Sequence, residues 1–202
     1  DSAALGRIFC VMLKDLEEKQ VTAVSGINTG LGGNPEGLKK KYYHLIILVR
    51  NQMGLKNLYK IVSEAHVNYF FKKPRVPRSL LNKYRDGLIL TSACEAGELY
   101  RAIVEGRSYE ELKKIASYYD VLEVQPLGNN AYMVREGKVE SEEVIKDFNR
   151  TIIKLGEDLH KPVIATGDVH FTEPEDAIYR SVLQAGNGFK DADNQPPLFY
   201  RT

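Results

Sequence analysis

The chain has 202 residues, which is enough for one domain of ordinary size, or one and a fraction. Its 43% of hydrophobic and 27% of charged residues are typical of a globular protein, and they exclude a disordered tail, a collagen-like fibre and a disulfide-stapled miniprotein. The chain has 28 Lys and Arg and 27 Asp and Glu, so its net charge is +1. This overall charge does not indicate a basic nucleic-acid-binding module.

Cysteine usage and the apolar runs bear on the compartment. Cys10 and Cys94 form no disulfide framework, which favours free thiols in a reducing compartment and hence a cytoplasmic location. No apolar run approaches the ~20 residues that a membrane span needs, so no membrane partner is expected. The first residues, DSAALGRIFCVML, lack both an initiator Met and the basic start of a signal peptide. We therefore expect a piece of a longer polypeptide.

The first expected element is a helix over residues 2–19, with one apolar face formed by Leu5, Ile8, Phe9, Met12, Leu13 and Leu16. Residues 20–41 are rich in glycine and end in three lysines, which is typical of a linker. The chain is thus divided into a helix at 1–19, a linker at 20–41 and a domain at 42–202.

Apolar runs and amphipathic segments alternate from Tyr42 onward. Buried strands are expected at 42–49, 87–91, 120–125 and 162–166, and helices at 53–65, around 80, at 95–105, 108–119, 141–159 and 175–185. Ser108 with Glu111 has capping-box spacing, and Ser141 is placed to cap the long helix. This order predicts an α/β fold with parallel strands. Four strands are too few for a closed barrel, which needs about eight, so either the sheet is open or part of a barrel lies outside this chain.

The sharpest local signal is TGDVHF at residues 166–171, directly after an expected strand. In parallel α/β folds functional groups lie at the carboxyl ends of strands. In an extended segment Asp168 and His170 point the same way, as a metal-ligand pair or an acid/base pair. The alternative interpretation, a turn aspartate beside a surface histidine, is equally good on the motif alone.

Cys94 also follows an expected strand and precedes an expected helix, where a thiol has a lowered pKa and ligates metal well. A small apolar residue in a tight turn is the alternative there. Glu95 and Glu98 are interpreted as partners of the helix dipole in its first turn. His44 begins an apolar strand, and a core histidine with a hydrogen-bond partner is its alternative interpretation.

His66 and His160 are assigned to structure. The remaining donors, His44, Cys94, Asp168 and His170, supply the N, S, O and N atoms expected for Zn²⁺ or a similar borderline metal. The chain has no P-loop, no GxGxxG after a strand and no GxSxG, which disfavours NTP hydrolysis, dinucleotide binding and α/β-hydrolase chemistry. The basic stretches 39–41 and 72–78 suit either nucleic-acid phosphates or solvated connectors.

The sequence around these residues is similar to that of a known protein family. The segments HLIILVRNQMGLKNLYKIVSEAH, KPRVPRSLL, GLILTSACEAGELYRAIVEG, LEVQP, KPVIATGDVHF, EDAIYR and GFKDADNQPPLFYRT resemble the PHP domain of bacterial replicative DNA polymerase III alpha subunits of the PolC type. The resemblance covers about residues 42–202. It implies a partial distorted βα barrel, similar to a TIM barrel, with a metal site that holds Zn²⁺ or Mn²⁺.

The resemblance also assigns residues. His44, Cys94, Asp168 and His170 match the last four ligand positions of the family, whereas the earlier ones lie upstream and are absent from this sequence. Residues 1–19 resemble the C-terminal helix of the 3′–5′ exonuclease that is inserted in the PHP domain of such polymerases. Asp1 is similar to the last carboxylate of that exonuclease's metal set.

Three functions follow from this resemblance. The first is a fragment of a replicative DNA polymerase, a nucleotidyltransferase that uses Mg²⁺ and whose partners are DNA, other replisome subunits and the rest of the same polypeptide. The fragment itself lacks the polymerase carboxylates and is expected to be inactive in polymerisation. The second is a stand-alone, metal-dependent PHP phosphoesterase, and the third is a structural module that stabilises a polymerase.

Overall fold

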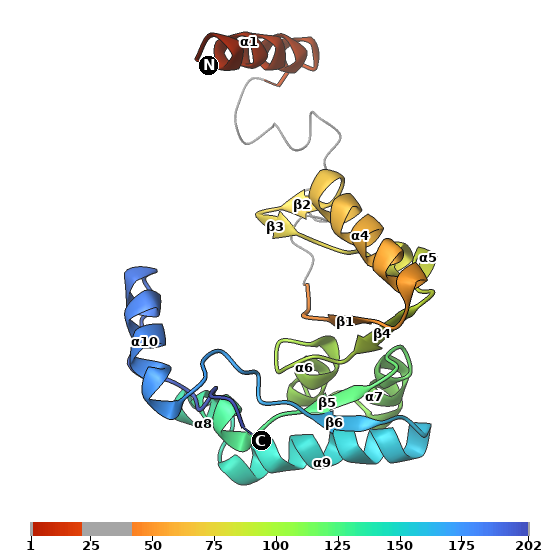
Figure 1. Ribbon diagram of the computed structural model, residues 1–202, viewed down its shortest axis with the longest axis vertical. Helices are drawn as coiled ribbons and strands as arrows, with labels where there is room; N and C mark the ends of the chain where they lie inside the picture. The colour runs from red at the N-terminus through yellow and green to blue at the C-terminus, as the bar shows by residue number, and fades with distance from the viewer. Residues whose placement is uncertain (1, 22–41, 202) are drawn as a thin grey trace. The chain divides into compact units, whose positions relative to one another are not determined.

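The computed structural model describes residues 2–21 and 42–201, and the chain divides into two compact units, Asp1–Tyr42 and Tyr43–Thr202. In the first unit, residues Ser2–Glu18 form helix α1, as the sequence predicts (Figure 1). Its apolar residues are exposed, with Phe9 at 60% and Val11 at 67%. The amphipathic pattern therefore predicts the helix correctly, while the described part of this unit provides no apolar surface that buries it.

The second unit alternates between strands and helices, as expected. Its elements are β1 (Ile46–Val49), α4 (Gln52–Val67), β2 (Phe70–Phe71), β3 (Lys73–Pro74), α5 (Arg78–Lys83), β4 (Leu88–Thr91), α6 (Glu98–Val104), α7 (Tyr109–Ala116), β5 (Leu122–Val124), η2 (Leu127–Asn130), α8 (Tyr132–Arg135), α9 (Glu142–Leu159), β6 (Val163–Ala165), η3 (Pro174–Asp176) and α10 (Ala177–Gly186). The mixed α/β class is thereby confirmed. The β2–β3 hairpin, η2 and α8 lie in segments that the sequence pattern left as connections.

Strand directions agree with the prediction in part. β5 pairs with β6 in parallel, and a parallel bridge between Thr91 and Val121 joins β4 to β5. β1, however, pairs antiparallel with β4, so the prediction of an all-parallel set is wrong for this strand. The chain leaves β1 at Arg50 and returns beside it at Gly87, whose carbonyl accepts the Arg50 N–H (2.9 Å). A parallel pair would instead require a crossover along the strands.

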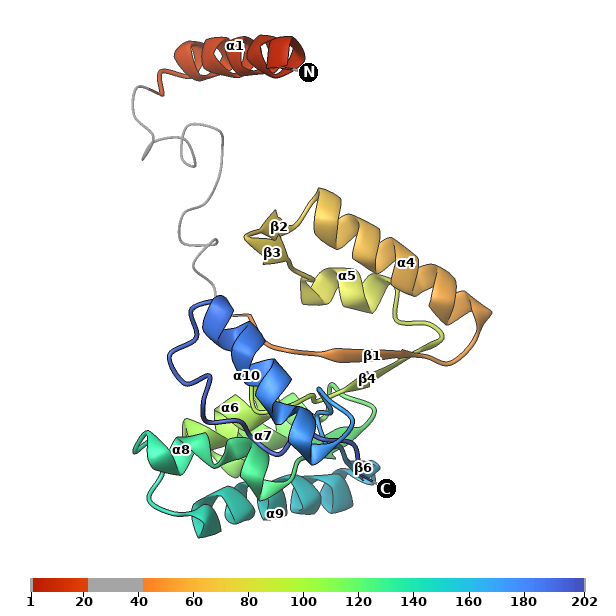
Figure 2. The same ribbon diagram turned by 60° about the vertical axis from the view of Figure 1, so that its left-hand side comes forward.

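The main core lies between the strands and helices α6, α7 and α9. Ile145, Ile152 and Leu155 on α9 are at most 1% exposed, on the helix face that the sequence predicts. Figure 1 shows α9 lying along β5 and β6, and Figure 2 shows α9 again beside β6. A smaller cluster of Ile61, Leu81 and Leu88 packs α4 and α5 against β4.

The expected buried strand at 42–49 is shorter and more exposed than predicted. Only Ile46–Val49 form β1, and Leu48 is 48% exposed. His44 lies before it, in an isolated parallel bridge with Gly97. An apolar run does not by itself specify what covers it, and in the described residues β1 has a hydrogen-bonded neighbour but no covering layer over most of its side chains.

The helix ends test the capping predictions. The capping box of Ser108 and Glu111 is present at α7. Ser141 occupies the N-cap position of α9, but its side chain accepts no capping hydrogen bond. The helix expected at 95–105 begins only at Glu98, after the N-cap Gly97, because the residues before it form a tight loop. That loop carries Cys94.

Candidate metal centre

The loop that bears Cys94 is fixed by its backbone. Ala93 adopts a left-handed conformation (φ 58°), which is unfavourable for a residue with a Cβ atom and is common at functional sites. The Gly97 N–H donates to the Cys94 carbonyl (2.8 Å), and a side chain at Gly97 would collide with the carbonyl oxygen of Ser92. These constraints hold the thiol immediately beyond the end of β4.

His44 is held against the same loop. Its backbone N–H donates to the Ala96 carbonyl (3.0 Å), and its Nδ1 lies 3.5 Å from Cys94 Sγ. Residues 50 positions apart in the chain are thus brought together as an imidazole and thiol pair. The imidazole is exposed, so the interpretation of His44 as a core histidine is not supported.

The environment of Cys94 differs from the one the sequence suggested. Burial raises the pKa of the thiol to about 12, and the neighbouring Glu95 adds to the rise. The expected lowering by a helix N-terminus is wrong, because α6 begins four residues further on. The thiol is therefore protonated at neutral pH, and thiolate forms there only if a cation compensates its charge.

Asp168 and His170 lie in the loop after β6. Asp168 is left-handed (φ 51°) rather than extended, so the two side chains do not align through strand geometry as predicted. His170 Nδ1 instead lies 2.6 Å from the Asp168 carbonyl oxygen. If Nδ1 carries the proton and donates it to that carbonyl, Nε2 is left as the free lone pair, which is the usual arrangement of a metal-binding imidazole.

Two further contacts fix this second loop. The Gly167 carbonyl accepts a hydrogen bond from Asn129 Nδ2 (3.0 Å), and the His170 N–H donates to the Leu198 carbonyl (2.8 Å). The first contact comes from the segment after β5 and the second from the C-terminal segment. The loop with Asp168 and His170 is thereby anchored on both sides, although both side chains are exposed.

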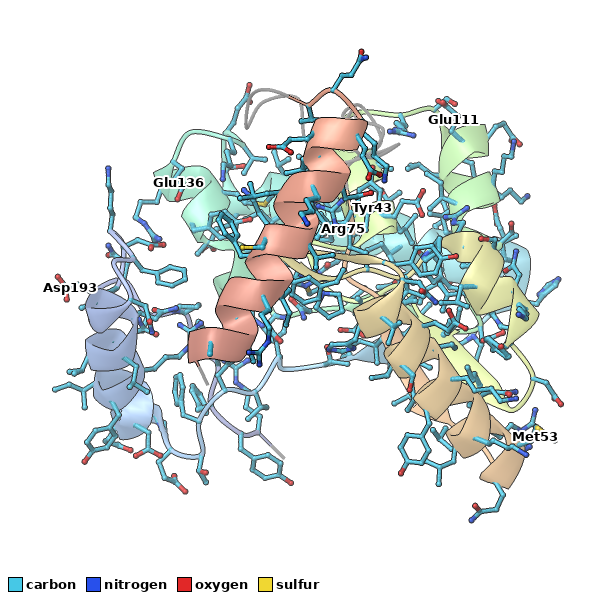
Figure 3. The ribbon with its side chains drawn as sticks, turned by 90° about the horizontal axis from the view of Figure 1, so that it is seen from above. Tyr43, Met53, Arg75, Glu111, Glu136 and Asp193 are labelled. Atoms are coloured by element: carbon cyan, nitrogen blue, oxygen red, sulfur yellow. The ribbon has the colours of Figure 1, made fainter. Side chains whose placement is uncertain are left out.

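All four predicted donors line one cavity of about 760 Å³. Its wall includes further polar side chains, namely Glu95, Asn129, Arg135, Glu136, Arg180, Gln184, Asp191, Asn194 and Gln195. Figure 3 shows Glu136 and Asp193 toward one side of this unit, with Glu111 and Met53 toward the other. Glu95 was interpreted as a helix dipole partner, but it stands before α6 and faces the cavity, whereas Glu98 begins α6 and pairs with Arg78. The glycine two residues after Glu95, an N-cap, is the sequence signal that could have separated these two carboxylates.

The donor atoms suit a borderline divalent metal, since two imidazoles, a thiol and a carboxylate are the ligand types that Zn²⁺ takes. They are carried by two loops: His44 Nδ1 lies near Cys94 Sγ, whereas His170 Nδ1 contacts the backbone carbonyl of Asp168. Over residues 2–21 and 42–201, no three His, Cys, Asp or Glu side chains stand close enough to hold an ion as they are. The chemistry of the set fits a metal, and ion binding would draw the two loops together or recruit donors from outside these residues.

Other predicted positions lie away from this cavity. His66 Nδ1 contacts the Val62 carbonyl (2.7 Å) within α4, and His160 is the left-handed C-cap of α9. In the basic connector, the guanidinium of Arg75 lies over the Phe71 ring and that of Arg78 over the Tyr118 ring. Asp1 and lysines 39–41 lie outside the described residues.

Comparison with known proteins identifies the class. The PHP domain family matches residues 9–125, which is more than half of the chain, and the chain belongs to this family. The chain is also similar to proteins described as DNA polymerase III PolC-type: 47% identical to that of Clostridium perfringens, 48% to that of Caldanaerobacter subterraneus and 40% to that of Bacillus subtilis. Each alignment covers the whole of this chain but only 14% of the relative. The resemblance seen in the sequence is thereby confirmed, for a segment of such polymerases.

Among the helices of the described residues, none combines the length and the apolar character that crossing a bilayer requires.

Proposed function

We propose that this chain is the PHP-domain segment of a replicative DNA polymerase of the PolC type, and that its cavity is a cation site of that domain. The observation that carries the proposal is the meeting of His44, Cys94, Asp168 and His170 around one cavity, in a chain that matches PolC-type polymerases over its whole length. DNA, replisome subunits and the rest of the same polypeptide are the partners that this assignment implies, in the cytoplasm.

The assignment extends to the parts of the chain. We propose that residues 42–202 are the C-terminal part of a distorted βα barrel, that 20–41 is a linker and that 1–19 is the last helix of an exonuclease. Zn²⁺ or Mn²⁺ would be held by His44, Cys94, Asp168 and His170 together with upstream donors of the same polypeptide, and Mg²⁺ would serve the polymerase itself. A cation there supplies charge that stabilises thiolate and, where a position stays open, activates water.

Segment exchange tests the polymerase assignment. The 202 residues replace the matching segment of the Clostridium perfringens polymerase, and primer extension is measured. We expect the exchanged enzyme to extend primers, because the segment supplies the same domain. An exchanged enzyme that folds but does not extend primers would overturn the assignment.

Phosphoester hydrolysis is a second candidate function, because Arg135 and Arg180 line the same cavity as the four donors and arginine binds phosphate oxygens. The exchanged polymerase carrying Asp168→Ala separates this function from a scaffolding role. If metal-dependent hydrolysis is lost while the melting temperature stays unchanged, the site is catalytic. If the melting temperature falls and hydrolysis was absent from the start, the site is structural.

The isolated chain provides a direct measurement of the site. We expect it to bind Zn²⁺ or Mn²⁺ weakly, since the upstream donors are missing and no three donors of the described residues stand close together. Elemental analysis of the purified chain after dialysis measures this, and tight stoichiometric metal would contradict the idea that the set is incomplete.

A further inference from the structure

Strand β5 carries a buried carboxylate between the two strands that precede the donor loops of the candidate metal centre. Glu123 is 3% exposed, and β5 lies between β4 and β6, the strands that lead to the two donor loops. A carboxylate so deeply buried is retained in a fold only where hydrogen-bond donors compensate its lost hydration. The donors that Glu123 uses are therefore informative.

Both carboxylate oxygens accept hydrogen bonds from threonines at strand ends. Thr91 Oγ1, at the end of β4, donates to Oε2 (3.1 Å), and Thr166 Oγ1, directly after β6, donates to Oε1 (2.6 Å). Thr91 stands three residues before Cys94, and Thr166 stands two residues before Asp168. One rigid group thus joins the starting points of both donor loops.

Backbone contacts extend this junction into the first loop. The Glu123 N–H donates to Ser92 Oγ (2.9 Å), and the Ala93 N–H donates to Thr91 Oγ1 (3.3 Å). Ala93 is the residue with the left-handed backbone next to Cys94. The threonine that binds Glu123 therefore also holds the strained residue of the loop, so the position of the thiol depends on the carboxylate.

We propose that Glu123 is a positioning residue, which sets the distance between the loop that bears Cys94 and the loop that bears Asp168 and His170. The inference rests on the proposed cation site and deepens it, since it names the group that holds the two donor loops at a fixed separation. Glu123 does not line the cavity and acts through Thr91 and Thr166.

Asp120 offers a matched control on the same side of the fold. Its Oδ2 accepts hydrogen bonds from the Leu90 N–H (2.7 Å) and from Arg85 (2.8 Å), so it also ties the start of β5 to β4. It is not among the residues of the cavity wall. A variant at Asp120 thus removes a carboxylate that links the same two strands, away from the donor loops.

The first measurement needs no metal. Amide hydrogen exchange is followed in the 202-residue chain and in Glu123→Ala, Thr91→Val, Thr166→Val and Asp120→Ala. We expect Glu123→Ala to raise exchange in both donor loops, at residues 92–97 and 167–170, by at least about tenfold, the loss expected for one hydrogen bond to a charged group. Thr91→Val is expected to affect the first loop and Thr166→Val the second, whereas Asp120→Ala affects neither.

The second measurement uses Co²⁺ alone as the probe, because a cobalt–thiolate bond has an intense near-ultraviolet absorption band that reports Cys94 directly. We expect Glu123→Ala to weaken Co²⁺ binding by about tenfold, the loss expected for one hydrogen bond to a charged group, with Asp120→Ala unchanged. Glu123→Gln is the conservative variant, since its amide oxygen can accept from one threonine and its amide nitrogen can donate to the other. It is expected to restore most of the affinity and the exchange protection.

The outcomes separate this inference from the proposed function. If wild type shows no cobalt–thiolate band, the cation site fails as proposed, and exchange in the two loops still decides the role of Glu123. If Glu123→Ala leaves exchange in both loops at the wild-type level, the inference is overturned. If Glu123→Ala unfolds, the role of Glu123 is tested with Thr91→Val, Thr166→Val and Glu123→Gln instead. Exchange in the loops equal to wild type in both threonine variants would then overturn the inference.

Discussion

Helices α9 and α10 have the same kind of amphipathic sequence but different surroundings. On α9, Ile145, Ile152 and Leu155 are buried against the sheet, whereas α10 has no buried residue. The apolar residues of α10 are 64–69% exposed and comprise Ile178, Tyr179, Val182 and Leu183. The comparison shows that an apolar stripe predicts the helix correctly in both segments. Whether the stripe is buried depends on which neighbouring elements the described chain supplies.

The paired strands β4 and β1 repeat this contrast. Leu88 and Leu90 of β4 are buried, whereas Leu48 and Val49 of the neighbouring β1 are 48% and 41% exposed. Both strands are apolar runs of similar composition. A closed region, built from β4, β5, α6, α7 and α9, thus lies beside elements with exposed apolar side chains, which also include β6, where Ile164 is 38% exposed.

The largest expected effect lies in the closed region. Leu155→Ala removes a side chain that is 0% exposed, and we expect a loss of about 2–5 kcal/mol in the free energy of unfolding, because the cavity it leaves cannot collapse fully. Urea denaturation followed by circular dichroism measures the loss. Val182→Ala on α10 is the matched control, with an expected change within about 0.5 kcal/mol. Equal losses at the two positions would contradict the contrast between the helices.

The second-largest effect on stability is expected at Lys161, whose ammonium group contacts the end of helix α7. Lys161 Nζ donates to the carbonyl oxygens of Ala116 (3.3 Å), the last residue of α7, and of Ser117 (2.7 Å) and Tyr119, which come after it. The Ala116 carbonyl also accepts the Tyr119 N–H (3.2 Å), but carbonyls at the C-terminal end of a helix lack intrahelical partners, so a cation there is stabilising. We expect Lys161→Met to cost about 1–3 kcal/mol in the free energy of unfolding, measured by urea denaturation. Lys146→Met on the exposed face of α9 is the control, and an equal cost there would contradict a capping role.

A pH effect follows from two core tyrosines. Burial raises the pKa values of Tyr100 and Tyr119 above the ordinary 10, and the proximity of Glu98 adds to the rise at Tyr119. Above pH 10 the unfolded chain loses the tyrosine protons, whereas the folded protein keeps them because its pKa values are raised. The folded state therefore has its full stability below pH 10 and loses stability as the pH rises further. We expect unfolding free energy to fall above pH 10 by about 1.4 kcal/mol per pH unit for each tyrosine. Urea midpoints from pH 8 to 11 measure this, and the same slope in the Tyr100→Phe, Tyr119→Phe double variant would contradict it.

The smallest effect belongs to the exposed face of α9. Arg150 Nη1 pairs with Glu143 and Asp147, each at 2.7 Å, but all three side chains are more than half exposed. Solvent screens such pairs, so we expect Arg150→Ala to change stability by less than about 1 kcal/mol. Thermal unfolding at low and high salt measures it. A loss as large as that of Leu155→Ala would show that this surface is not as open to solvent as its exposure indicates.

Much of the local structure could be predicted from the sequence. The apolar faces of α1 and α9, the capping box of Ser108 and Glu111, and the strand positions depend on nearby residues alone, and these predictions are confirmed. The direction of β1 could not be predicted, since it depends on where the chain returns at Gly87. The burial of β1 and α10 could not be predicted either, because a hydrophobic pattern does not specify its partner.

The candidate site was predictable as a set of donors but not as an arrangement. Strand-end positions pointed to Cys94, Asp168 and His170, and they line one cavity. The left-handed backbone at Asp168 and the raised pKa of Cys94 depend on contacts far apart in the chain. The buried Glu123 gave no signal, because it stands within a strand and reaches the site only through two threonines.

The contact between the His170 N–H and the Leu198 carbonyl has a consequence for the order of folding. The donor set joins residues far apart in sequence, and such contacts form late because long loops must close first. A polypeptide emerging from the ribosome can therefore pack Leu122, Ile145 and Leu155 before the second donor loop is anchored. The main core cluster can thus form in the nascent chain before the site does.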